Sequence, residues 1–258
     1  MPIAPPHPVQ TLTVPLTHRC DLFDRLDTIQ PERHSSAAPR PMEDFGQGYG
    51  FILYRTTLHG PRIGPEPIEL RGLADRAVLY LNGRYIGRYM RDRVSEPIRV
   101  AVGEGDRLDI LVENCGRVCF GDIIDRKGIL EAVTISRRRV FNWEIRCLPM
   151  DSDVPYDAYT GVSLPERPAF YRGVFDAIAG VDTYFDASGW EKGFVRVNGF
   201  NIGRYWSAGP QTSLYVPGDL LRSSGNVVEV FELHTPSPTV VFTDSLRLTS
   251  PVSAAHTV

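Results

Sequence analysis

The sequence has no run of 18 apolar residues, so nothing in it could cross a membrane as a helix. Its charges nearly balance, with 28 Lys+Arg against 31 Asp+Glu, so no overall positive charge favours nucleic acid or an anionic membrane. Residues 1–6 contain neither the basic start nor the apolar stretch of a signal peptide, and we expect a cytoplasmic protein.

Cysteine is scarce, and it forms no metal-binding pattern. The four cysteines are Cys20, Cys115, Cys119 and Cys147. Only Cys115 and Cys119 are close, and no second Cys/His pair stands at ligand spacing. We therefore expect free, mostly buried thiols in a reducing compartment, with no metal and no cofactor.

Glycine and proline, in contrast, are abundant, with 23 and 21 residues respectively, and they interrupt nearly every window that could hold a long helix. From residue 49 onward, short β-branched and aromatic runs alternate with turn residues. The clearest runs are residues 51–58, 77–81, 98–102, 108–113 and 130–135. This regular cycle of strands and turns is typical of an all-β sandwich or barrel.

The chain also repeats itself. Residues 79–89 match residues 195–205, and the offset between Asn82 and Asn198 is 198 − 82 = 116 residues. In both copies an Asn-Gly pair supplies the positive φ of a tight hairpin. Each copy is followed by a Gly-Asp turn and a strand that ends in glutamate, Glu113 or Glu232. A period this long indicates two duplicated domains.

We therefore expect five regions along the chain: an N-terminal strand, turn and linker (1–48), a first domain (49–150), a linker (151–168), a second domain (169–250) and a tail (251–258). Within the first region, residues 9–16 have the alternation of a strand and residues 21–26 could form a helical turn.

Four residues of the second copy are candidates for carbohydrate binding: Trp190, Arg204, Tyr205 and Trp206. Aromatic faces suit the C–H face of a sugar ring, and an arginine can bond sugar hydroxyls. Large aromatic side chains at strand ends also cap cores or bury interfaces, so both interpretations stay open.

Several long motifs resemble the C-terminal region of family 35 glycoside hydrolases, the β-galactosidases. They are residues 193–217, which include the Val-Asn-Gly-Phe-Asn-Ile-Gly-Arg-Tyr-Trp run, and residues 49–58, 111–117, 127–130 and 168–171. The resemblance implies two tandem jelly-roll domains of the galactose-binding-like type. It also implies that they pack against a catalytic (β/α)8 barrel.

The family's retaining chemistry requires two glutamates about 5–5.5 Å apart, and both belong to that barrel. A barrel needs about 250 residues of its own, and this sequence begins where the barrel would end. Glu229 and Glu232 stand three apart on an expected strand and so point to opposite faces. We assign no catalytic residue and expect the chain alone to be inactive.

We expect the barrel to be supplied elsewhere, with a separate catalytic barrel chain as a candidate partner, and to meet an exposed apolar or aromatic patch. The candidate interface residues are Tyr49, Tyr54, Arg55, Asn114, Arg117 and Phe120. Here the sequence departs from the family, which usually has Asn-Tyr-Gly where this chain has Cys119-Phe120-Gly121. The exchange removes an amide and a hydroxyl, which puts polar contacts of segment 114–121 toward the barrel in doubt.

Two alternative hypotheses remain. The chain could be a free-standing galactoside-binding module, which calorimetry with β-galactosides would test, or a structural remnant with no activity, ligand or partner. A buried Trp206 would count against the binding module.

Overall fold

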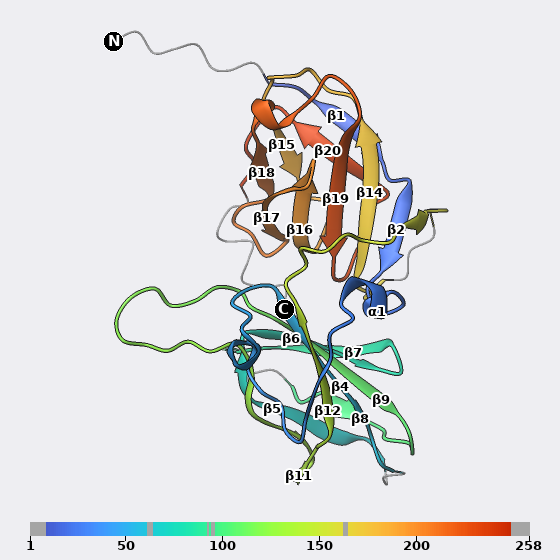
Figure 1. Cartoon of the computed structure of the whole chain (residues 1–258), viewed down its shortest axis with the longest axis vertical. Coiled ribbons are helices and arrows are strands. Elements are labelled where there is room, and N and C mark those ends of the chain that lie inside the picture. The colour runs from blue at the N-terminus through green and yellow to red at the C-terminus, as the bar shows by residue number, and fades with distance from the viewer. Residues whose placement is uncertain (1–8, 61–63, 92, 94–95, 162–164, 249–258) are drawn as a thin grey trace. The chain divides into compact units, whose positions relative to one another are not determined.

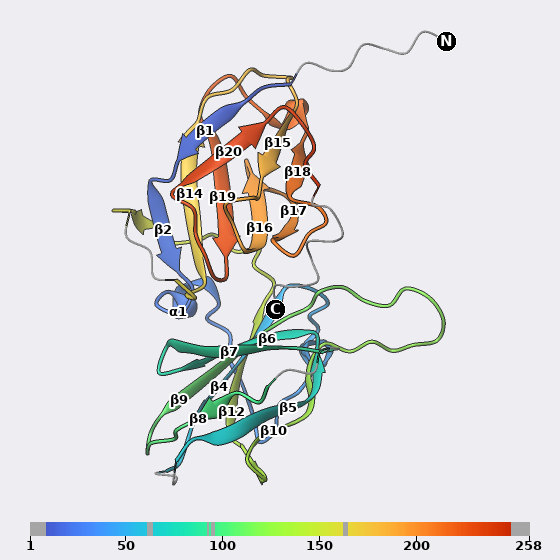
Figure 2. The same ribbon diagram turned by 180° about the vertical axis from the view of Figure 1, so that it is seen from behind.

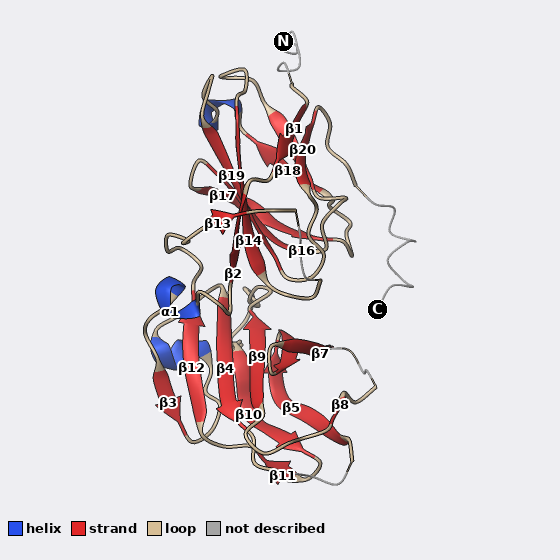
Figure 3. Ribbon diagram, turned by 90° about the vertical axis from the view of Figure 1, so that its right-hand side faces the viewer, coloured by secondary structure: helices blue, strands red, loops and turns tan. Residues whose placement is uncertain are grey.

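The computed structural model describes residues 9–60, 64–91, 93, 96–161 and 165–248, which form two compact units (Figure 1). Unit 1 combines the described residues up to Arg25 with those from Val154 onward, and unit 2 runs from Leu26 to Asp153. Strands dominate both units (Figure 3). No described helix is long and apolar enough to cross a membrane.

Unit 2 is a sandwich of a six-stranded and a four-stranded antiparallel sheet. The larger sheet has the order β3 (His34–Ser36), β12 (Trp143–Leu148), β4 (Phe51–Thr57), β9 (Arg107–Glu113), β6 (Arg76–Leu81) and β7 (Arg84–Met90). The smaller sheet has the order β11 (Arg138–Arg139), β10 (Gly128–Ile135), β5 (Glu66–Ala74) and β8 (Arg99–Val100). The unit also contains α1 (Leu26–Ile29) and a 3₁₀ turn at Met42–Phe45.

Unit 1 repeats this six-plus-four arrangement. Its larger sheet has the order β13 (Asp157–Ala158), β2 (His18–Asp21), β14 (Ala169–Phe175), β19 (Asn226–Glu232), β16 (Lys192–Val197) and β17 (Phe200–Trp206). Its smaller sheet has the order β1 (Leu12–Pro15), β20 (Thr239–Thr243), β15 (Thr183–Asp186) and β18 (Ser213–Val216), seen from behind in Figure 2. A 3₁₀ turn spans Gly218–Leu220. The expected all-β class with two tandem jelly-roll sandwiches is confirmed.

The repeated hairpins have the same backbone geometry. At the β6–β7 turn Asn82 has φ 52° and Gly83 φ 77°, and at the β16–β17 turn Asn198 has φ 50° and Gly199 φ 82°. Both hairpins also carry a register shift at the same place, after Leu79 in one and after Val195 in the other. The Asn-Gly pairs are therefore structural turn residues in both copies.

The N-terminal residues belong to unit 1, which the sequence did not suggest. Strand β1 pairs with β20 and β2 pairs with β14, so the start of the described chain completes both sheets of the second sandwich. The expected turn at 21–26 is present, because the Asp21 carboxylate accepts from the N–H groups of Phe23 and Asp24, and the short helix α1 follows from Leu26. The expected tail 251–258 lies outside the described residues.

Each sandwich has its own apolar core, in which a tryptophan is buried. Trp143 lies in the core of unit 2 and Trp190 in that of unit 1, with 1% and 3% of their surfaces exposed. The Trp143 indole N–H donates to the Val140 carbonyl at 3.1 Å, which satisfies its one polar group.

Tyr54 in the core of unit 2 makes two hydrogen bonds through one hydroxyl. The hydroxyl donates to the Arg40 carbonyl at 2.7 Å and accepts from the Ile129 N–H at 3.1 Å. We expect Tyr54→Phe to lower the free energy of unfolding by about 1–3 kcal/mol, because both buried backbone groups lose their partner. Tyr49→Phe, at a 56% exposed position, is the control and should change it by less than about 0.5 kcal/mol in urea denaturation. Equal effects of both substitutions would contradict this assignment.

Candidate functional site

The long connection between β9 and β10, which we call the 114–127 loop, presents apolar side chains to solvent. Phe120 is 88% exposed, Ile124 87%, Ile123 63% and Val118 49%. In Figure 1 it is the long green loop that extends away from the strands of unit 2. Four large apolar side chains on one exposed loop are the kind of surface that marks an interaction site.

The end of this loop is held by a buried group of charges. The Lys127 ammonium, 1% exposed, donates to both carboxylate oxygens of Asp75 at 2.9 Å and to Asp125 at 2.7 Å. The other oxygen of Asp125 pairs with Arg91 at 2.7 Å. Hydrogen bonds from Lys127 and Arg91 lower the pKa of Asp125 far below its usual value, so its carboxylate stays ionised.

Both carboxylates also bind backbone groups of the loop. The Cys115 N–H donates to Asp75 at 2.9 Å, and the Val118 N–H donates to Asp125 at 3.1 Å. One charged cluster therefore fixes the departing and the returning ends of the 114–127 loop. Its apolar residues project from a rigid base.

Arg117 ties the loop to the segment before β4. Its guanidinium donates to the Gly48 carbonyl at 3.0 Å, to the Asp125 carbonyl at 2.6 Å and to Glu43 at 2.5 Å. Exposed Tyr49 follows Gly48 directly and donates a hydrogen bond to Asp151. The aromatic ring of Tyr49 is thus carried by a segment bonded to the loop base.

The six candidate interface residues divide into two groups. Tyr49, Arg117 and Phe120 reach the surface, whereas Tyr54 is fully buried and Asn114 is 5% exposed. Arg55 lies opposite Asp109 in the sheet and pairs with it at 2.6 Å. Tyr54, Asn114 and Arg55 therefore serve the structure of unit 2 itself. The role of the exposed three as an interface stays a prediction.

The four candidate carbohydrate residues also divide. Trp190 and Tyr205 are each 3% exposed in the core of unit 1, so neither offers a ring face to solvent. Because side chains alternate along β17, Arg204 and Trp206 lie on the opposite face from Tyr205. Arg204 is exposed and Trp206 half-buried, so sugar binding by these two stays a prediction.

Two buried groups flank Trp206 and Tyr205. The Lys192 ammonium lies 4.1 Å from the centre of the Trp206 ring, a cation–π contact across the β16–β17 pair. The Tyr205 hydroxyl donates to Glu232 at 2.9 Å. Burial raises the pKa of Glu232 to about 7, although several backbone N–H donors oppose the shift.

Sequence reasoning missed two features. It selected Phe120 but not Val118, Ile123 and Ile124, whose signal was an apolar run inside a turn-rich segment. It also found no metal-type cluster, whereas Glu166, Glu191 and His234 converge in unit 1. These three residues are far apart in the sequence and do not stand at the spacing of any metal-binding motif.

Two domain families match the two sandwiches. Residues 39–150 match the model described as "Beta-galactosidase, first all-beta domain", and residues 168–226 match "Beta-galactosidase, galactose-binding domain". The chain thus consists of β-sandwich domains of a glycoside-hydrolase type. By these domains and by its curated relatives, it belongs to the β-galactosidase family.

Among the relatives, a β-galactosidase of Xanthomonas manihotis is 38% identical over 222 residues, which cover 83% of this chain and 36% of that protein. A human β-galactosidase is 37% identical over 214 residues, covering 72% and 31%. The mouse "Beta-galactosidase-1-like protein" is 35% identical over 268 aligned residues, covering 96% and 41%. The chain thus spans about a third of the length of these relatives.

Among solved structures, a Ruminococcus gnavus β-glucuronidase aligns with 84% of this chain and 40% of its own, with 14% identity and a TM-score of 0.33. A β-galacturonidase from Eisenbergiella tayi aligns with 92% and 39%, with 11% identity and a TM-score of 0.31. Likenesses this distant support no inference about function.

Lys127→Met should strongly destabilise unit 2. The substitution keeps the approximate volume of the side chain but removes the buried cation, so that Asp75 and Asp125 keep only their pairs with the partly exposed Arg91, a loss of about 3 kcal/mol. Arg126→Met is the control, because the neighbouring Arg126 is partly exposed and its pairs with Glu43 and Asp44 should contribute at most about 1 kcal/mol. Urea denaturation of both variants measures the difference, and similar losses would contradict a special role for Lys127.

The same cluster predicts an acid-dependent loss of stability. Because the pKa of Asp125 lies below the ordinary value of 3.8, ionisation of this group stabilises the folded state above that pH. The contribution is lost progressively as the pH falls below 3.8 toward the folded-state pKa. Asp125→Asn should therefore flatten the pH dependence of the urea midpoint in this acidic range. An unchanged dependence would contradict the assignment.

Proposed function

We propose that these 258 residues form the non-catalytic tandem jelly-roll region of a family 35 β-galactosidase. In this proposal they support a catalytic barrel that lies outside them, on the same or a separate chain, in the hydrolysis of β-galactosides. The family membership of both sandwiches supports the substrate class, and the exposed apolar residues of the 114–127 loop support the docking role.

The two glutamates considered for catalysis are committed to other contacts. Glu229 accepts a hydrogen bond from Tyr156 at 2.8 Å and lies 4.0 Å from Arg196. Glu232 is 1% exposed and accepts from the N–H groups of Lys192 and His234. Both carboxylates are thus engaged by donors of the chain itself, which supports a barrel as the source of the catalytic pair.

The apolar loop is the observation that carries the docking proposal. A loop with flexible ends would lose conformational entropy on binding, whereas the Lys127 cluster and Arg117 hold this one before any partner arrives. Phe120 and Ile124 are the natural anchors, because large apolar side chains at the centre of an interface contribute most of its affinity.

We also propose a cytoplasmic location. Cys20, Cys119 and Cys147 are free thiols in the structure, and reducing compartments keep thiols from forming disulfides.

Complementation tests the docking role. The chain is mixed with the remaining part of the Xanthomonas manihotis β-galactosidase, expressed without its aligned region, and hydrolysis of a chromogenic β-galactoside is followed. We expect no turnover from the chain alone and turnover from the mixture. The double variant Phe120→Asp, Ile124→Asp should lower the apparent affinity of the two parts at least about tenfold, since it places charge in an apolar contact.

The matched control is Phe141→Asp, which places the same charge on a 51% exposed phenylalanine elsewhere in unit 2. It should leave complementation unchanged. An equal loss in both variants, or full activity in the loop variant, would refute docking through the 114–127 loop.

A second candidate function is the binding of galactosides by unit 1. The domain family's name and the half-buried Trp206 ring beside exposed Arg204 favour it. On this hypothesis the ring stacks on the apolar face of galactose while Arg204 bonds hydroxyls.

Calorimetry with galactose tests this candidate. We expect saturable heat from the intact chain and at least about tenfold weaker binding by Trp206→Ala, because the stacking surface is removed. Tyr215→Ala is the control, since Tyr215 is a 48% exposed ring on the other sheet of unit 1. The absence of saturable heat, or equal effects of the two substitutions, would eliminate the binding role.

A further inference from the structure

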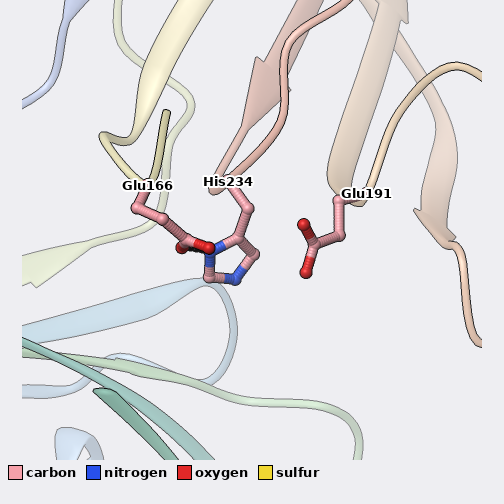
Figure 4. A group of neighbouring side chains, drawn as sticks. All are labelled: Glu166, Glu191 and His234. Atoms are coloured by element: carbon pink, nitrogen blue, oxygen red, sulfur yellow. Dashed lines mark hydrogen bonds and ion pairs between the residues drawn. The ribbon is translucent and has the colours of Figure 1, made fainter. Parts of the chain in front are cut away.

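Glu166, Glu191 and His234 converge at one edge of the larger sheet of unit 1. One donor atom from each lies within 4.8 Å of the other two. The His234 ring is fully buried and its Nδ1 bonds the Glu166 carboxylate, while both glutamates are partly exposed. Figure 4 shows the imidazole between the two carboxylates, with each glutamate on a different side of the ring.

The sheet register explains why residues so distant in sequence meet. Strand β19 lies between β14 and β16, and Glu232 at its end is opposite Ala169 on one side and Gly193 on the other. Glu166 precedes Ala169 by three residues, Glu191 precedes Gly193 by two, and His234 follows Glu232 by two. Three neighbouring strands therefore deliver their flanking residues to the same edge.

The backbones of all three residues are fixed. The Glu232 carboxylate accepts from the N–H of Glu191 at 3.0 Å and from that of His234 at 2.7 Å. The Glu166 N–H donates to the His234 carbonyl at 2.8 Å. Buried Glu232 thus holds the backbones of Glu191 and His234 in place. The positions of the donor atoms can then change only by rotation of the side chains.

A hydroxyl orients one of the two carboxylate donors. The Thr235 Oγ1 donates to a carboxylate oxygen of Glu191 at 3.0 Å. Outer contacts of this kind orient ligating carboxylates in metal sites.

We propose that Glu166, Glu191 and His234 form a binding site for a divalent transition-metal ion of the zinc class. One imidazole nitrogen and two carboxylates are a donor set that zinc accepts, and three protein ligands leave a fourth tetrahedral position for water. The mixed nitrogen and oxygen donors select against calcium and magnesium, which prefer oxygen alone.

The separation of the donors fits this ion after a small adjustment. Zinc bonds of about 2.1 Å in a tetrahedron place donor atoms about 3.4 Å apart. Because the donor atoms lie within 4.8 Å of one another, the widest pair has to close by at most about 1.4 Å (4.8 − 3.4). Glu191 and Glu166 can make this movement because both side chains are partly exposed, while the buried imidazole stays in place.

Zinc titration by calorimetry tests the proposal on the full chain, freed of any affinity tag. The exposed thiol of Cys119 is another zinc donor, so the parent protein for all measurements carries Cys119→Ser. We expect one zinc ion per chain to bind saturably and to raise the temperature of thermal unfolding. Glu191→Gln and Glu166→Gln should each weaken binding at least about tenfold.

Glu131→Gln is the matched control, because it makes the same exchange at an exposed position of β10 in unit 2 and should bind zinc like the parent. Thr235→Val, which only removes the hydroxyl on Glu191, should weaken zinc binding without unfolding the chain, and it replaces Glu166→Gln if that variant misfolds. Absence of saturable zinc binding would overturn the proposal and leave a Glu166–His234 hydrogen bond. Equal affinity of the parent and Glu191→Gln would overturn it as well.

Discussion

Each sandwich buries ionisable side chains at the edge where its central strands end. The need to provide partners for these side chains determines much of the structure at that edge. A charged side chain removed from water is tolerated only when it is paired or fully hydrogen-bonded. In unit 1 this holds for Glu232, whose oxygens accept from backbone amides and from Tyr205. In unit 2 buried Lys127 is satisfied by Asp75 and Asp125. The partners of each buried group come from neighbouring segments of the chain, so the hydrogen bonds and ion pairs also hold these segments in place.

The segments immobilised in this way are the ones that carry the chemical features of the molecule. Glu113 ends β9 and Glu232 ends β19, the corresponding central strands of the two copies, and both are buried. The chain after Glu113 is the 114–127 loop, and the chain after Glu232 contains His234. One duplicated architecture thus presents an exposed apolar loop in one copy and a polar cluster in the other. The two copies share the order of their central strands and a buried glutamate at the end of one of them. They differ in the residues that follow this glutamate.

Local patterns in the sequence predicted much of this fold. The Asn82-Gly83 and Asn198-Gly199 turns are encoded by the residues that form them, so the repeat and its hairpins could be read directly. The pairing of β1 with β20 could not, because it joins residues more than two hundred positions apart and depends on which sheet edge remains open. The sequence also did not show which aromatic side chains are buried. Trp190 and Trp206 are the same residue type near the ends of neighbouring strands, yet only Trp190 enters the core.

The two candidate sites differ in how the sequence encodes them, and this difference follows from their physics. An apolar loop is a continuous stretch, so Phe120, Ile123 and Ile124 stand close together in the sequence, and all three are exposed. A cluster built from strand ends is discontinuous, since Glu166, Glu191 and His234 meet only through the register of three strands. The sheet edge therefore accommodates a polar site without a local motif, provided that a buried group such as Glu232 holds the strand ends in register. Substitutions at Glu232 should for that reason disturb both flanking segments together, whereas substitutions at Glu191 act on one donor alone.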